Sequence, residues 1–245
     1  MFSNITVTDM IRWGVSRMRK ANVHYFYFGT PDLFVTASYL TFFVLNLPYD
    51  YKNLVYLNSK LEKHEILAIK KIINKRITTR LPTPYITNEH WYGVPKITFY
   101  VNQDVFISRS PIRHKLQDFM KDVTWNNNKV LDLGAGSGAI GIILALLNPN
   151  IQVDLVDICP KALKVAQINI DKYNLGKRVK CIQSDLFKNI KNKYDFIVTV
   201  PPQISMEEYK TISAEALHEP TISLISEKDG LKHIKSIIEE APKYL

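Results

Sequence analysis

The chain has 245 residues, of which 46% are hydrophobic and 22% charged, and its formal net charge is +9. This length and composition are ordinary for a soluble globular protein of one large or two modest domains. We expect no signal peptide, since Met1 to Asp9 lacks a basic start followed by an apolar stretch. We also expect no membrane span, because the most apolar segment, Leu33 to Leu47, is broken by polar residues and falls short of about 20 residues.

The positive net charge has two possible explanations, and the sequence does not decide between them. It fits a partner rich in phosphate, such as ribosomal RNA, and it fits a drift toward lysine and asparagine codons, since the lysines are dispersed. The two cysteines, Cys159 and Cys181, have neither metal-binding nor redox spacing. We therefore expect reduced thiols, a cytoplasmic location and no metal.

Residues 1–80 predict a small helical domain. Thr8 is expected to cap a first helix, and Thr30-Pro31 to begin a second that continues into Leu33 to Leu47. A short helix is expected near Tyr51 to Tyr56. Ser59 to Glu62 form a capping box ahead of an apolar stripe with helical spacing.

Residues 81–110 predict a linker and a β-hairpin. Leu81 to Gly93 carry two prolines and several aromatic residues, among which His90 is expected to be a packed polar residue. Lys96 to Val101 and Val105 to Ser108 alternate around a polar turn, which indicates a hairpin. Ser110-Pro111 then predicts the start of a helix that continues to Val123.

The most informative stretch is Val130 to Gly141, an apolar strand followed by Gly134, Gly136 and Gly138 and then a helical pattern. Such a strand–turn–helix binds a nucleotide-like ligand, because bare backbone and a helix N-terminus face it. A ligand-free turn and a dinucleotide site, which Ala139 in the last small position permits, are the alternatives. Asp132 lies inside the strand, where a dinucleotide strand is normally apolar, and its carboxylate can face an ammonium group.

Three further predicted strands follow, and the first two end at acidic residues and the third at two prolines. Gln152 to Val156 is followed by Asp157, whose two oxygens suit a ribose diol. Arg178 to Ile182 is followed by Ser184 and Asp185, and Phe196 to Val200 by Pro201 and Pro202. This pattern resembles the class I S-adenosylmethionine methyltransferases, so we expect a Rossmann-like α/β domain over residues 111–245.

The whole chain resembles the bacterial protein-glutamine amide methyltransferases, the HemK/PrmB-like family, and is closest to its ribosomal-protein branch. The segments that carry this resemblance are Ile11 to Arg17, Tyr85 to Asn88, Trp91 to Gly93, Ser108 to Ile112, Asp157 to Leu163, His218 to Pro220, Asp229 to Leu231 and Ala241 to Leu245. The resemblance implies methylation of a glutamine amide in the third large-subunit ribosomal protein, with the helical domain recognising that protein. It further implies that the three glycines hold the methionine end of the cofactor, Asp157 the ribose and Asp185 the adenine amine, with Leu186 or Phe187 packed nearby.

The sequence departs from the family in its catalytic segment, which is Asn-Pro-Pro-Tyr in the family and Val200-Pro201-Pro202-Gln203 here. An amide nitrogen is a poor nucleophile, and the family's asparagine and a backbone carbonyl hold its N–H bonds toward the methyl group. Val200 has no side-chain acceptor, and Gln203 lies on the other side of the prolines. Activity is therefore expected to be impaired.

The second departure is at the C-terminus, where one helix, about Gly230 to Ala241, follows the fourth strand. The class I sheet normally has three more strands, so we expect an incomplete domain with the fourth strand at an edge. An inactive, cofactor-binding remnant of the family and an adenine-specific nucleic-acid methyltransferase remain as alternatives.

Overall fold

The computed structural model describes residues 4–23, 32–47, 55–91, 97–108, 118, 125–227 and 229–245. The chain divides into two compact units, Met1–Thr87 with Ser213–His218, and Asn88–Ile212 with Glu219–Leu245. Residues 213–218 thus belong with the N-terminal helices, although they follow most of the second unit in the chain. No pattern in the sequence indicates this return.

The first unit is built from α1 (Val7–Lys20), α2 (Leu33–Val44), α3 (Lys63–Thr79) and the short α4 (Thr83–Thr87). They enclose an apolar core of buried residues that includes Met18, Leu40 and Ile69. α2 has Asp32 as its N-cap. The expected start at Thr30-Pro31 and most of the short helix near Tyr51 lie outside the described residues. Among the helices that the structure describes, none is long and apolar enough to cross a membrane.

Two predicted helix caps are wrong. α1 is capped by Thr6 rather than Thr8, and α3 begins after Glu62, three residues beyond the box expected at Ser59. Lys60 forms an antiparallel bridge with Thr6, and its neighbours are bonded to the start of α1: Val7 N–H donates to the Ser59 carbonyl and Leu61 N–H to the Ile5 carbonyl. Long-range pairing therefore takes this segment away from the helix.

The predicted hairpin is also wrong. β2 (Thr98–Tyr100) pairs antiparallel with β1 (Glu89–Trp91), which lies in the expected linker. Residues 105–108 form no strand, although Val105 and Ile107 are buried, so their alternation reflects burial rather than pairing. The helix expected from Ser110 lies outside the described residues, apart from helical Asp118.

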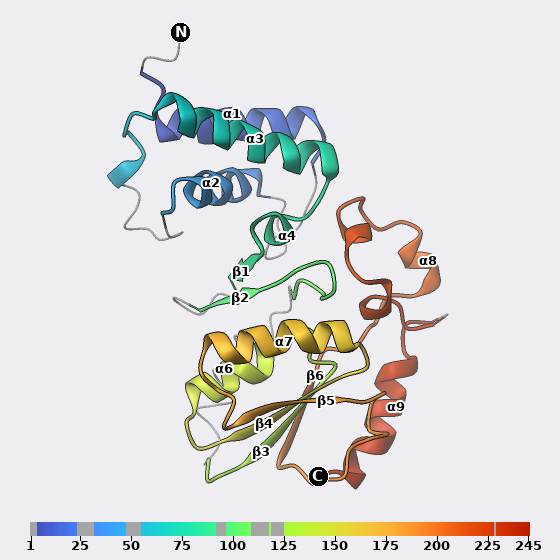
Figure 1. Ribbon diagram of the computed structural model, residues 1–245. Coiled ribbons are helices and arrows are strands. Elements are labelled where there is room, and N and C mark those ends of the chain that lie inside the picture. Colours follow the sequence, from blue (N-terminus) through green and yellow to red (C-terminus); the bar gives the residue numbers. More distant parts are fainter. Residues whose placement is uncertain are drawn as a thin grey trace. The chain divides into compact units, whose positions relative to one another are not determined.

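The second unit contains the predicted α/β sheet, which is parallel with strand order β5-β4-β3-β6. The strands are β3 (Lys129–Leu133), β4 (Gln152–Asp157), β5 (Val179–Gln183) and β6 (Phe196–Thr199). α6 (Ala139–Leu147) and α7 (Pro160–Lys172) pack on one face, and α9 (Lys232–Glu240) covers the other (Figure 1). β6 is an edge strand of the described sheet, as expected. Because the strands are parallel, the carboxyl ends of all four lie at the same end of the sheet, and this is where ligands bind in such sheets.

Candidate functional site

A cavity of about 230 Å³ opens at the carboxyl edge of the sheet. This volume is close to the lower limit of the range of about 300–1,000 Å³ that small-molecule sites occupy. The cavity is therefore near the size of a ligand site and is not a packing defect. The residues that line it come from the ends of all four strands, from residues 104–108 and from the chain after β6. They are Asp104, Val105, Phe106, Ser108, Leu133, Gly134, Ala135, Gly136, Ser137, Ala139, Ile140, Val156, Asp157, Ile158, Cys159, Ala162, Ser184, Asp185, Leu186, Val200, Pro202, Pro220, Ile222, Ser223 and His233.

The glycine turn between β3 and α6 forms one wall. Gly134, Gly136 and Gly138 have φ of 75°, 55° and 77°, a region that disfavours other residues. A Cβ built on Gly134 or Gly136 would meet nothing within 4 Å, so the turn leaves open space above its backbone. The N–H groups of Gly134 and Ala135 donate to the Val156 carbonyl at 2.8 and 2.9 Å, which ties the turn to β4.

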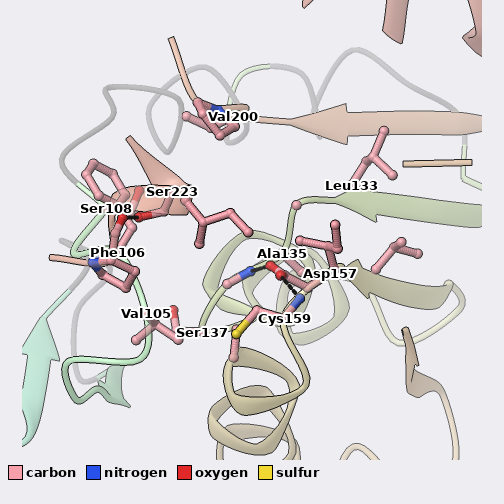
Figure 2. A pocket seen from close by; sticks show the side chains of 18 of the residues that line it. Val105, Phe106, Ser108, Leu133, Ala135, Ser137, Asp157, Cys159, Val200 and Ser223 are labelled. Carbon is pink, nitrogen blue, oxygen red and sulfur yellow. Dashed lines mark hydrogen bonds between the residues drawn. The ribbon is translucent and has the colours of Figure 1, made fainter. Parts of the chain in front are cut away.

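Asp157, at the end of β4, is held between the glycine turn and the next helix (Figure 2). Gly136 N–H donates to one carboxylate oxygen at 2.9 Å, and Cys159 N–H to the other at 2.8 Å. Burial raises the pKa of Asp157, and these backbone donors partly oppose the rise. Each oxygen keeps a further lone pair, so the carboxylate can still accept from two ligand hydroxyls.

Asp132 lies behind the turn rather than in the cavity. It is 1% exposed, and its Oδ2 accepts from Gly141 N–H in the first turn of α6 at 2.8 Å. Burial raises its pKa to about 7, and the charge of Asp157 adds to the rise. Asp132 therefore supports the turn from inside and is not among the residues that line the cavity.

The residues after β5 are divided between the cavity and the core. Asp185 and Leu186 line the cavity, and Asp185 forms an ion pair with Lys188 at 2.6 Å. Phe187 is buried instead and stacks on Tyr244 with ring centroids 4.7 Å apart. Of the two residues expected to pack near the ligand's base, Leu186 is the one that reaches the cavity.

The segment after β6 contributes Val200 (Figure 2) and Pro202 to the cavity lining, whereas Pro201 and Gln203 are not among the lining residues. Gln203 is exposed. The Thr199 hydroxyl donates to the Leu133 carbonyl at 2.6 Å and so fixes the end of β6 beside the glycine turn. The side of the cavity at β6 is therefore apolar at Val200.

Two polar residues at the site were not anticipated. Asn169 is fully buried, and its amide group donates to the carbonyls of Ser137 and Tyr100, at 2.9 and 3.0 Å. It thereby ties the glycine turn to α7 and β2. The sequence feature that could have indicated this role is an asparagine on the apolar face of an amphipathic helix. His233 lines the cavity from α9, and no local pattern marks it.

Both cysteines are free thiols and form no disulfide. Within the described residues, no group of three or more His, Cys, Asp and Glu side chains is arranged to hold a metal ion. The polar side chains that line the cavity carry carboxylates, serine hydroxyls, one thiol and one imidazole.

Comparison with known proteins identifies relatives at two levels. Residues 102–227 match the family model of the methyltransferase small domain. Over 98% of its length, the chain is 37% identical to the ribosomal protein uL3 glutamine methyltransferases of Neisseria meningitidis serogroup B and of Neisseria gonorrhoeae, covering 79% and 80% of those proteins. In fold it resembles the hMettl16 catalytic domain solved in complex with MAT2A 3'UTR hairpin 1, with a TM-score of 0.52 and 16% identity over 87% of this chain and 73% of that one.

Proposed function

Because the chain belongs to the family of ribosomal protein uL3 glutamine methyltransferases, we propose that it methylates a glutamine side-chain amide of ribosomal protein uL3. The observation that carries this proposal is the extent of the match, which runs through 98% of the chain, including the helical unit. We further propose that the protein works in the cytoplasm, that the helical unit recognises the protein substrate, and that the excess of lysine faces nearby ribosomal RNA.

The cavity fits S-adenosylmethionine, which supplies a methyl group on a positively charged sulfur. Gly134, Gly136 and Gly138 would hold its methionine end, because the turn leaves open space that a Cβ would fill at two of them. Asp157 would accept from the ribose hydroxyls, since its carboxylate already has a fixed orientation. Asp185 would accept from the adenine amine at the cavity wall.

The proposed catalytic segment is Val200, Pro201, Pro202 and Gln203. In the reaction, the amide nitrogen forms a bond to the methyl carbon, the sulfur–carbon bond breaks, and the nitrogen releases one proton to solvent. The nitrogen must be aligned with the methyl group, because its lone pair is delocalised into the carbonyl. The Val200 side chain cannot hold an N–H bond, so alignment depends on backbone carbonyls and on other cavity residues.

The test uses the purified full chain, isotopically labelled S-adenosylmethionine and uL3 isolated without its methylation. We expect label on one uL3 glutamine, located by peptide mass spectrometry, and loss of both labelling and cofactor binding in Gly136→Val. Cofactor binding without labelling would instead identify an inactive remnant. Labelling of adenine in RNA or DNA offered in parallel would identify a nucleic-acid methyltransferase.

A further inference from the structure

α9 begins beside the chain that follows β6, and two backbone features place it there. Ile204 and Ile225 form an isolated parallel bridge, and Ser226 N–H donates to the Ile204 carbonyl at 3.0 Å. Gly230 has a φ of 74°, and a Cβ on it would lie 2.6 Å from the Gln203 carbonyl oxygen, so only a glycine fits there. The start of α9 is thus held against the segment that follows Val200.

This arrangement brings His233, in the first turn of α9, to the cavity that Val200 and Pro202 also line. Its ring is held from behind by Ser226, which is 0% exposed. The Ser226 Oγ lies 2.7 Å from His233 Nδ1 and accepts from the His233 backbone N–H at 3.1 Å. The orientation of the imidazole is therefore set by a buried hydroxyl on the chain that follows Ile225.

The two contacts of Ser226 also decide which ring nitrogen carries the proton. The hydroxyl oxygen accepts from the backbone N–H, so its own hydrogen is available for Nδ1. In the opposite tautomer Nδ1 would donate, and the buried hydroxyl hydrogen would have no acceptor within the part of the chain that the structure describes, which is costly. The neutral ring then carries its proton on Nε2, for which no described residue is an acceptor.

We propose that His233 Nε2–H donates a hydrogen bond to the side-chain carbonyl oxygen of the target glutamine and so determines which end of the amide faces the methyl donor. This inference rests on the proposed function. An amide presents an oxygen and an NH2 group at similar positions, and the oxygen is the more electron-rich atom. Val200 has no polar side-chain atom with which to distinguish them. A donor that captures the oxygen turns the nitrogen toward the methyl group.

The experiment compares His233→Leu with His233→Gln in the full chain. Leucine keeps bulk but no donor, and glutamine keeps an N–H donor. We expect kcat/KM for uL3 to fall about tenfold or more in His233→Leu, by the loss of one hydrogen bond, and to stay within about threefold in His233→Gln. Ile238→Ala, at a 68% exposed position of the same helix, is the matched control and should leave kcat/KM unchanged.

Calorimetry with S-adenosylhomocysteine separates substrate from cofactor. The affinity of His233→Leu should equal that of the wild type, and a matching loss of cofactor affinity would overturn the proposal, since Nε2 would then serve the cofactor. Equal activity of His233→Leu and the wild type would overturn it as well. A wild-type chain that binds cofactor but does not methylate uL3 would refute the proposed function instead, and the inference with it.

A spectroscopic readout does not depend on turnover. In the chain labelled with 15N-histidine and measured at alkaline pH, His233 should show its proton on Nε2, and Ser226→Ala should remove this preference. A proton on Nδ1 in the wild type would contradict the assigned donor even in an active enzyme. His64, exposed on α3, has its Nδ1 3.2 Å from a Glu62 carboxylate oxygen and so provides the contrasting reference, a ring that is expected to carry its proton on Nδ1.

Discussion

At the scale of single residues, Asp157 carries the clearest expectation for cofactor binding. Asp157→Asn should weaken S-adenosylhomocysteine binding by about 1.5–3 kcal/mol, the value of a hydrogen bond to a charged group. An amide in this position also turns an NH2 group toward one of the two backbone N–H donors at Gly136 and Cys159. Calorimetry measures the loss. An analogue without ribose hydroxyls should bind wild type and variant about equally, and an undiminished difference would show that Asp157 does not serve the ribose.

Asp132 predicts how stability depends on pH. Its pKa is raised to about 7 in the folded protein, against 3.8 as the ordinary value, so between about pH 4 and 7 the folded state keeps a proton that the unfolded state has released. This contribution to stability is present below pH 4 and is lost as the pH rises through 7, by up to ~1.4 kcal/mol per pH unit. The raised pKa of Asp157 acts in the same direction.

Urea unfolding at several pH values measures this dependence. Asp132→Asn should flatten the decline in the free energy of unfolding between pH 4 and 7, because an amide does not titrate and its oxygen can still accept from Gly141. Asp171→Asn, on the exposed side of α7, serves as the control and should leave the decline in place. A variant at Asp132 with the wild-type slope would show that this carboxyl is not the group responsible.

Substitution of Val200 is predicted to raise the rate of methylation rather than lower it. The double change Val200→Asn with Gln203→Tyr restores the family's segment and adds an acceptor for the reacting amide. One transition-state hydrogen bond is worth about 10²–10³ in kcat in other enzymes, so turnover should rise toward that range while cofactor affinity stays unchanged. Single-turnover kinetics on uL3 measures it. An unchanged rate in a well-folded double variant would mean that the acceptor at position 200 is dispensable.

At the scale of elements, the glycine turn predicts two different outcomes for one substitution. Gly136→Ala faces open space and meets only the strain of its φ of 55°, about 1–2 kcal/mol. Gly138→Ala has similar strain, and its Cβ would also lie 2.8 Å from the Leu155 side chain. Gly138→Ala should therefore lower the melting temperature more, whereas Gly136→Ala should lower cofactor affinity more than stability. Equal effects on both quantities would contradict this division.

The helices and strands also show how much of the fold can be predicted from the sequence. The strand–glycine–helix unit and the four strands carry their own signals, because burial on both faces and positive φ leave local marks on composition. The pairing of β2 with β1 and the late start of α3 depend on partners distant in the chain, which periodicity does not reveal. The same holds within the site. Asp157 and Asp185 follow strands and could be anticipated, whereas His233 reaches the cavity only through the Ile204–Ile225 bridge.

At the scale of the whole molecule, the first unit depends on a buried ion pair between distant parts of the chain. Arg76 on α3 is 1% exposed, and its guanidinium lies 3.4 Å from Glu215, a residue of the returning segment 213–218 that also contacts Arg80 at 3.3 Å. Glu215→Gln leaves the Arg76 charge poorly compensated and should lower the free energy of unfolding by about 3–5 kcal/mol.

Denaturant unfolding of the full chain tests this expectation. Asp229→Asn, which breaks an ion pair with Lys235 between side chains that are 55% and 61% exposed, is the matched control and should lower the free energy of unfolding far less than Glu215→Gln does. A cost at Glu215 no greater than that at Asp229 would show that Arg76 finds compensation elsewhere.

The return of residues 213–218 also has a consequence for synthesis on the ribosome. Arg76 and Glu215 are 139 positions apart in the chain. At about 5–20 residues per second, the helices of the first unit wait about 7–28 s after Arg76 is made before Glu215 follows. During that interval all four strands of the sheet are translated, whereas the charge of Arg76 still lacks its carboxylate. Synthesis of the N-terminal unit therefore begins first. This unit nevertheless cannot complete its structure until the sheet of the second unit has left the ribosome.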